Sequence, residues 1–368
     1  MITTEQIFGA YTDTLHLRSD QFLGLSEPNV KTKSLHIFFF PGNPGTLYFY
    51  INFLERLLNG IRDSDYFAEY EYIYCHGTGN ANHHLEGSST STVQSETTCD
   101  DVESYGLEYQ IRHKLAFIKS VIDPLRAQDV DNTEIMMIGH SIGAYMAIDA
   151  LQRCEYFMQR TKHVLLLMPF ISWSKLPKVH RTKLSLFSYF HPRSHHLVTF
   201  LMGPLLRMNP GLRRNILGTV TSLKGKILSI VSDGLINRRI LDNFLVMGYD
   251  EIRDVKKNQL NTISLLEELD RGKRCGEKEI LMLYTDNDDW ASLKDAKIFE
   301  ERLKCNTTIT VEPGLTHGFS LTDARIEKTC LVITDYFSSK KDLKASSKDV
   351  SHKVLFTDGG PRSIKSRL

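Results

Sequence analysis

Cysteine and long apolar runs are both scarce in this chain of 368 residues. The six cysteines are scattered, and no two of them form a C-x-x-C pair. Dispersed cysteines argue against a disulfide framework and favour a reducing compartment. No stretch reaches the roughly 18 apolar residues that a membrane-spanning helix requires. The first residues, MITTEQIFGAYTDTLHL, also lack the basic start and apolar segment of a secretory signal. We therefore expect a soluble protein or one bound peripherally to a membrane.

An excess of charge is missing as well. The formal net charge is +1, which argues against a general nucleic-acid binder, so we expect no nucleic-acid partner. His83 and His84 are adjacent in a polar segment, but no second ligand cluster stands at a suitable spacing. We therefore predict no metal site and no cofactor.

Strand-like and helix-like patterns alternate along the chain, which is long enough for one large α/β domain with an insertion. Apolar or β-rich runs predict strands at 35–40, 69–75, 133–139, 163–170, 279–286 and 308–314. Helical spacing predicts helices at 46–58, 107–125, 144–153, 293–303 and 324–337. This alternation predicts an α/β fold with a mainly parallel sheet covered by helices on both faces.

The alternation is interrupted once, and the interruption sets the predicted domain boundaries. Residues 1–170 would form the first part of the core and residues 277–339 the second part. Residues 171–276 would form a helical lid or cap inserted between them. Residues 340–368 are rich in Lys, Ser and Asp and poor in apolar residues, so we predict a disordered tail.

A G-x-S-x-G pentapeptide follows the strand predicted at 133–139. It consists of Gly139, His140, Ser141, Ile142 and Gly143, and a helix-forming run comes next. A tight turn between a strand and a helix exposes a nucleophilic serine, and glycines on both sides relieve the crowding. We therefore predict that Ser141 is a nucleophile in such an elbow, and that its neighbour His140 is a packed residue of the elbow. The alternative is a turn with a structural role only.

The partners of such a serine are expected later in the chain, the acid first and then the histidine, each just after a strand. Three aspartates follow the strand at 279–286, and we choose Asp288 as the acid. In the competing interpretations, Asp286 caps the turn or Asp289 caps the next helix. His317 lies in the Gly-flanked loop after the last predicted strand, and we predict that it is the general base.

Backbone N–H groups should stabilise the oxyanion that forms during acyl transfer. One donor is expected at Ile142, the residue after the nucleophile. A second is expected in the loop Pro41-Gly42-Asn43-Pro44-Gly45, where prolines cannot donate and glycines allow close approach. We choose Asn43 first and Gly42 as the alternative. A rigid turn without a catalytic part is the competing interpretation.

The stretches FFFPGNPG, YGLEYQIRHKLAFI, GHSIGAY, DNDDW and THGF occur here in the order found in lipid droplet-associated hydrolases. The resemblance spans roughly residues 33–337 and places the chain in the α/β-hydrolase superfamily. By resemblance, the triad falls on Ser141, Asp288 and His317. The usual Y-G-x-x-D-P-W stretch of the family is altered, since Thr285 and Asp289 replace its Gly and Pro.

The resemblance also implies an activity and a location. It implies a serine esterase or lipase-like enzyme at the cytosolic surface of lipid droplets, with the endoplasmic reticulum or cytosol as further locations. Sterol esters or acylglycerols are the implied substrates.

The predicted insertion concentrates positive charge. Between Phe170 and Met247 twelve Lys or Arg residues face two acids, so this segment carries a net charge of +10. Apolar runs at 184–190, 197–206 and 228–231 interleave with the charge. Basic residues beside short apolar segments favour contact with an anionic phospholipid surface. We therefore predict that residues 171–248 bind a lipid droplet or membrane surface. An ordinary helical cap is the alternative.

Two classes of function remain compatible with the sequence. The first is a serine hydrolase that cleaves lipid esters through an acyl-enzyme. The second is a droplet-surface organising protein that keeps the hydrolase fold and turns over little ester. A soluble hydrolase of small esters or thioesters is a third possibility, because fold alone does not fix the substrate.

Overall fold

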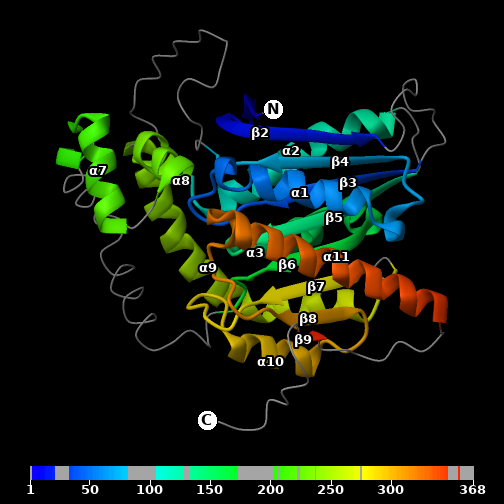
Figure 1. Ribbon diagram of the computed structural model, residues 1–368. Coiled ribbons are helices and arrows are strands. Elements are labelled where there is room, and N and C mark those ends of the chain that lie inside the picture. Colours follow the sequence, from blue (N-terminus) through cyan, green and yellow to red (C-terminus); the bar gives the residue numbers. More distant parts are fainter. Residues whose placement is uncertain are drawn as a thin grey trace.

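The computed structural model describes residues 2–20, 33–81, 105–127, 132–172, 203–205, 207–221, 224–236, 238–273, 276–346 and 355–356. Within these residues the strands form one sheet that crosses the middle of the molecule (Figure 1). Its strand order is β1-β2-β4-β3-β5-β6-β7-β8-β9. The strands are β1 (Ile2–Ile7), β2 (Ala10–Asp20), β3 (Ser34–Phe40), β4 (Tyr72–Thr78), β5 (Thr133–His140), β6 (Thr161–Leu167), β7 (Glu279–Tyr284), β8 (Thr307–Val311) and β9 (Leu355–Phe356).

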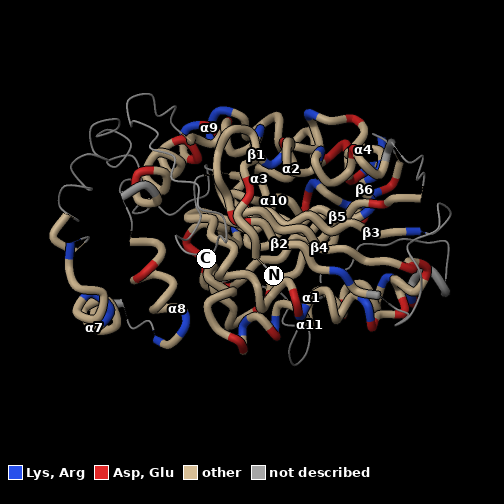
Figure 2. The backbone as a smooth tube through the Cα atoms, turned by 90° about the horizontal axis from the view of Figure 1, so that it is seen from above, with Lys and Arg blue, Asp and Glu red and all other residues tan. Residues whose placement is uncertain are grey.

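Helices cover the sheet on both faces. Seen from above, α1 and α11 lie on one face, and α2, α3 and α9 lie on the other (Figure 2). The α-helices are α1 (Ile51–Arg62), α2 (Leu107–Ala127), α3 (Ile142–Arg153), α4 (Glu155–Arg160), α7 (Pro210–Thr221), α8 (Gly225–Ser229), α9 (Arg238–Asp270), α10 (Leu293–Arg302) and α11 (Asp323–Ser346). Short 3-10 turns are η1 (Leu47–Phe49), η2 (Asp65–Phe67) and η4 (Phe319–Leu321), and η3 (Ile230–Leu235) is a π-helix.

The central strands are the apolar runs of the sequence. All seven residues of β3 are buried, and seven of the eight residues of β5 are buried. Strands buried on both faces suit a parallel sheet sandwiched between helices, and β3, β4, β5, β6, β7, β8 and β9 pair in parallel. β4 lies on one side of β3 and β5 on the other, so the chain changes direction here. Ligands of open α/β sheets bind beyond the carboxyl ends of the strands at such a point.

The two predicted parts of the core build a single sheet, because β6 pairs directly with β7. The described part of the predicted insertion holds α7, α8, η3 and α9. The long helix α9 packs on α2 and α3, whereas α7 and α8 pack on each other and on η3. In both views α7 and α8 stand apart from the sheet (Figures 1 and 2). The apolar run at 184–190 and most of the run at 197–206 lie outside the described residues.

The structure corrects three expectations at the ends of elements. β1 and β2 form an antiparallel hairpin that the sequence did not predict, and β2 pairs with β4. β4 continues to Thr78, three residues past the strand predicted at 69–75. α11 passes the predicted boundary at residue 339 and continues to Ser346, and Leu355–Phe356 pair with β8. The predicted disorder is therefore wrong for these residues, and the rest of the predicted tail lies outside the described residues.

Candidate active site

Ser141 occupies a sharp turn between β5 and α3. Its backbone has φ 56° and ψ −123°, a region that residues with side chains rarely adopt. A Cβ atom on Gly139 would lie 2.4 Å from the carbonyl oxygen of Gly143, and one on Gly143 would lie 2.2 Å from that of Phe40. Side chains are therefore excluded at both glycine positions, and the strand and helix can approach closely enough to push Ser141 outward.

Hydrogen bonds to the neighbouring strand hold this strained turn in place. The N–H of Ser141 donates to the carbonyl of Leu167 at the end of β6, over 3.0 Å. The carbonyl of Ser141 accepts from the N–H of Phe170 over 3.1 Å. The backbone of Ser141 is thus fixed from both sides, while its side chain is free to meet other groups.

His317, in the loop after β8, joins Ser141 to Asp288. Its Nε2 lies 2.8 Å from the Oγ of Ser141, and its Nδ1 lies 2.8 Å from Oδ2 of Asp288. The Asp288 side chain is fully buried, whereas the His317 side chain is 25% exposed. With the proton on Nδ1 directed at the carboxylate, Nε2 can accept the serine proton. The three residues chosen from the sequence therefore meet in one hydrogen-bonded chain.

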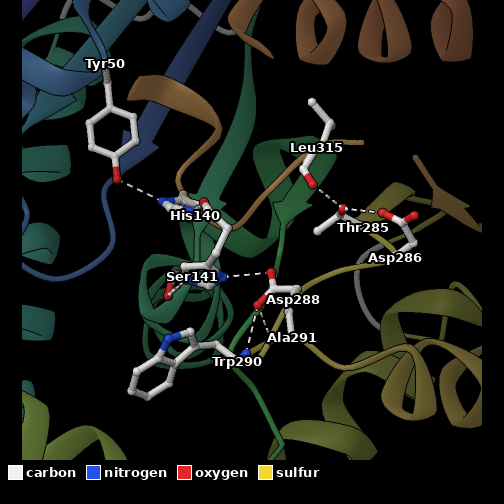
Figure 3. A network of polar contacts seen from close by, with 10 residues as sticks. Tyr50, His140, Ser141, Thr285, Asp286, Asp288, Trp290, Ala291 and Leu315 are labelled. Carbon is white, nitrogen blue, oxygen red and sulfur yellow. Dashed lines mark hydrogen bonds and ion pairs between the residues drawn. The ribbon is translucent and has the colours of Figure 1, made fainter. Parts of the chain in front are cut away.

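The structure distinguishes the three aspartates after β7. The Oδ1 of Asp288 accepts the N–H groups of Trp290 and Ala291, over 2.8 and 3.0 Å, which orients its other oxygen toward His317 (Figure 3). Asp286 instead accepts the N–H of Gly314 over 3.1 Å, so it ties this loop to the turn after β8.

The alternative role considered for Asp289 is wrong. The residue that caps α10 is Ser292, whose side chain accepts the N–H of Asp295. Asp289 is exposed and does not contribute the cap. An N-cap residue lies directly before the first residue of a helix, and Ser292 lies directly before Leu293. The interpretation of Asp289 as the cap placed the start of α10 too early.

His140, the residue before Ser141, is buried and bonded through both ring nitrogens. Its Nε2–H donates to the backbone carbonyl of His317 over 2.9 Å, and its Nδ1 accepts the hydroxyl proton of Tyr50 over 2.8 Å (Figure 3). Burial lowers the pKa of His140 well below its ordinary value, and the nearby His317 lowers it further. His140 is therefore neutral at neutral pH, and it positions the loop that carries His317.

The loop predicted to hold an oxyanion donor runs directly beside the serine. A Cβ atom on Gly42 would lie 3.0 Å from the Cβ of Ser141. The N–H of Gly42 is directed at the hydroxyl of Tyr50, so Asn43 stays the predicted second donor. Ile142 begins α3, so its N–H is one of the donors in the first turn that have no partner within the helix.

Three residues of this site escaped the sequence analysis. Tyr50 bonds to His140, Asn80 donates to the carbonyl of Gly42 over 3.3 Å, and Glu251 contacts the side chain of Asn43. Nothing in the local sequence marks Tyr50 or Asn80. Glu251 had a signal: Met247, Glu251 and Val255 follow one another every four residues on the buried side of α9, so a glutamate interrupts an apolar stripe.

Among the described residues, no group of three or more His, Cys, Asp or Glu side chains is placed to hold a metal ion. His83 and His84 lie outside the described residues. None of the described helices combines the length and the apolar character that crossing a bilayer requires.

Comparison with known proteins identifies the family. A family model described as lipid-droplet associated hydrolase matches residues 33–320. The chain belongs to this family. A human lipid droplet-associated hydrolase is 28% identical over 148 residues, which are 39% of this chain and 38% of the human protein. The rat protein of the same name is 32% identical over 37% of each chain. The chicken protein is 24% identical, and its match covers 80% of this chain and 82% of that protein.

Solved structures of other proteins share the fold of this family member. A soluble variant of monoglyceride lipase from Saccharomyces cerevisiae superposes with a TM-score of 0.51 at 12% identity, covering 92% of this chain and 95% of that one. A haloalkane dehalogenase from Bradyrhizobium elkani superposes with a TM-score of 0.55 at 13% identity, covering 93% and 99%. The predicted α/β-hydrolase fold is therefore confirmed.

Proposed function

We propose that the protein is a serine hydrolase that cleaves lipid esters, with sterol esters or acylglycerols as substrates, at the cytosolic surface of lipid droplets. The observation that carries this proposal is the chain of two 2.8 Å hydrogen bonds from Ser141 through His317 to Asp288. Membership of the lipid-droplet associated hydrolase family supports the substrate class and the location. The yeast relative in fold is named a monoglyceride lipase, which agrees with an ester substrate.

The geometry supports a two-step acyl transfer. The Oγ of Ser141 bonds to the ester carbonyl carbon while Nε2 of His317 takes its proton. The carbonyl oxygen becomes an oxyanion held by the N–H groups of Ile142 and Asn43. When the C–O bond to the alcohol breaks, the alcohol leaves with the proton from His317. Water then attacks the acyl-enzyme with His317 again as base, and the fatty acid is released while Ser141 regains its proton. Asp288 stays ionised and orients the imidazole.

A fluorophosphonate serine probe tests the nucleophile. We expect labelling of the purified protein to be lost in Ser141→Ala and retained in Ser338→Ala, which alters an exposed serine of α11. Labelling should rise when a phospholipid-coated triolein emulsion is added. A folded wild-type protein that takes up no label with or without emulsion would instead favour the droplet-surface organising protein. Fast turnover of a small soluble ester that emulsion does not increase would favour the soluble esterase.

We also propose that residues 171–248 bind the phospholipid surface. On the described part of this segment, Leu212 and Val220 of α7 are exposed to 54% and 77%, and Lys224 and Lys226 are exposed beside them in sequence. The cations of these helices are Arg213 and Arg214 in α7 and Lys226 at the start of α8. Apolar side chains next to cations favour an interface that is both apolar and anionic.

Flotation with vesicles tests this surface. We expect binding to vesicles that contain phosphatidylserine, and weaker binding when Lys224 and Lys226 are both changed to Glu. Lys256 and Lys257, two exposed lysines of α9 outside the segment, provide the matched control when changed in the same way. Equal flotation of both double variants and the wild type would contradict the role of this segment.

A further inference from the structure

The loop proposed to hold an oxyanion donor, residues 41–46, is called the oxyanion loop here. The long helix α9 contacts it directly. The Nδ2 of Asn43 donates to the backbone carbonyl of Phe244 over 3.0 Å. Asn80, whose Nδ2 donates to the carbonyl of Gly42, also lies 3.2 Å from the Sδ of Met247. The loop that passes beside Ser141 is thus held from behind by a helix of the insertion.

Glu251 lies one turn further along the same side of α9. Its residue is 7% exposed, and its carboxyl group contacts the side-chain amide of Asn43. Among the described residues, neither Oε1 of Glu251 nor Oδ1 of Asn43 has a hydrogen-bond partner, although both atoms are buried. An ionised Glu251 would leave both of these buried oxygens without a donor. A protonated carboxyl group supplies the missing O–H.

The surroundings of Glu251 favour that uncharged form. Burial raises the pKa of Glu251 to about 8, the contact with Asn43 opposes the shift, and the carboxylate of Asp250 adds to it. Asp250 itself is engaged elsewhere, because it accepts the N–H of Leu107 and forms an ion pair with Arg253. At neutral pH most molecules therefore carry an uncharged Glu251.

No titratable group on the elements that pack against α9 offsets the raised pKa of Glu251. α9 packs on α2 and α3, and residues 41–46 of the oxyanion loop contain no titratable side chain. The titratable side chains described on these helices are Glu108, Tyr109, Arg112, His113, Lys114, Lys119 and Asp123 of α2 and Tyr145, Asp149 and Arg153 of α3. None of them acts on the pKa of Glu251, so within the described residues its charge state depends on burial, Asn43 and Asp250.

We infer that uncharged Glu251 is a positioning residue that holds Asn43, and with it the oxyanion-binding N–H, beside Ser141. This inference rests on the proposed serine hydrolase function. An ionised Glu251 would place a negative charge behind the loop where a second negative charge develops during attack. At a buried position such a charge acts strongly, and it would oppose formation of the oxyanion. The insertion therefore takes part in the reaction through one of its own side chains.

The pH dependence of serine labelling tests the inference. We expect the labelling rate of the wild type to fall above pH 8, and to be about tenfold lower at pH 9 than on the plateau, as Glu251 loses its proton. Glu251→Gln replaces the carboxyl group by an amide, which can donate and accept hydrogen bonds but cannot ionise. The labelling rate of this variant should therefore stay level across this pH range. Glu268→Gln, the same change at an exposed glutamate of α9, should follow the wild type.

A second variant separates positioning from general damage. In Glu251→Ala we expect kcat for a p-nitrophenyl ester at pH 7 to fall about tenfold with little change in KM, because an interaction needed in the transition state is lost. Glu251→Gln should restore kcat. Should the alanine variant fail to fold, the glutamine profile alone decides.

The outcomes separate this inference from the proposed function. A labelled wild type with the same alkaline fall in Glu251→Gln overturns the inference and leaves the hydrolase intact. A folded wild type that takes up no label at any pH overturns the proposed function and this inference with it.

Discussion

Tyr50 links the two loops that meet at the nucleophile. Its hydroxyl donates to Nδ1 of His140, and the N–H of Gly42 is directed at the same oxygen. His140 in turn donates a hydrogen bond from Nε2–H to the backbone carbonyl of His317. One phenol group therefore fixes both the oxyanion loop and the loop that carries the proposed base. Burial raises the pKa of Tyr50, so this hydroxyl keeps its proton across the working range.

We expect Tyr50→Phe to lower the labelling rate of Ser141 about tenfold and to lower the free energy of unfolding by about 1–3 kcal/mol. The reason is that a buried ring nitrogen of His140 and the N–H of Gly42 lose a partner. Fluorophosphonate kinetics and chemical denaturation measure the two effects. Tyr336→Phe, the same change at a buried tyrosine of α11, is the control. Equal effects of both substitutions would contradict the positioning role of Tyr50.

At the scale of residues, the sequence predicted those that follow a rule about strand ends. Ser141, Asp288 and His317 each follow a parallel strand, and parallel strands end at one edge of the sheet, so their meeting could be expected. Tyr50, directly before α1, and Glu251 of α9 reach the site across long sequence separations. Their contacts depend on how helices pack, which no local pattern specifies.

At the scale of elements, the apolar runs predicted the central strands to within a few residues. The hairpin of β1 and β2 was missed because its residues are mostly polar, as in ITTEQI, and lack an apolar run. Buried polar side chains such as Thr12, Asp13 and Thr14 pack there instead, held by contacts with other strands. The end of α11 was also missed, because the residues after 339 are mostly Lys, Asp and Ser and form no apolar stripe in the sequence.

The last residue of α9 anchors this helix to the core. Asp270 is 1% exposed, and its carboxylate accepts the N–H groups of Lys304, Cys305 and Asn306 in the turn before β8 and that of Thr307, the first residue of β8. Burial alone would raise the pKa of Asp270, but these hydrogen bonds outweigh it and lower the pKa below its ordinary value. The C-terminal end of α9 is therefore tied to the sheet.

We expect Asp270→Asn to lower the free energy of unfolding at pH 7 by about 1–3 kcal/mol, because an amide cannot accept all of these bonds. The folded-state pKa is depressed, so the contribution is present above the unfolded pKa and is lost as pH falls through the folded value. The difference in free energy of unfolding between wild type and variant should therefore become smaller below about pH 4. Urea denaturation between pH 3 and 7 measures it, with Asp335→Asn on the exposed side of α11 as control. A gap that stays constant with pH would contradict this account.

At the scale of the whole molecule, the described residues fall into a continuous core and an outlying pair of helices. Pairing of β6 with β7 and packing of α1 against α11 join the segments on either side of the insertion. α9 belongs to the core because it packs on α2 and α3. α7 and α8 rest mainly on each other and on η3, and few of their residues are buried.

Hydrogen exchange should show this division. We expect amides of α7 and α8 to exchange at least about 100-fold faster than those of β5 and α3, because elements with few buried contacts open without unfolding of the core. α9 should exchange at a rate close to that of α3, although it belongs to the same insertion. Mass spectrometry of peptides after deuterium labelling measures these rates. Equal protection of the amides of α7, α9 and α3 from exchange would contradict this division.

The backbone of Ser141 implies a conflict between stability and activity. A residue with a side chain at φ 56° carries a cost of roughly 1–3 kcal/mol, which glycine would not carry. Ser141→Gly should therefore melt at a higher temperature than both the wild type and Ser141→Ala, while being unable to form an acyl-enzyme. Selection for stability alone would remove this serine. In the proposed chemistry, selection for turnover explains why a less stable residue persists at this position.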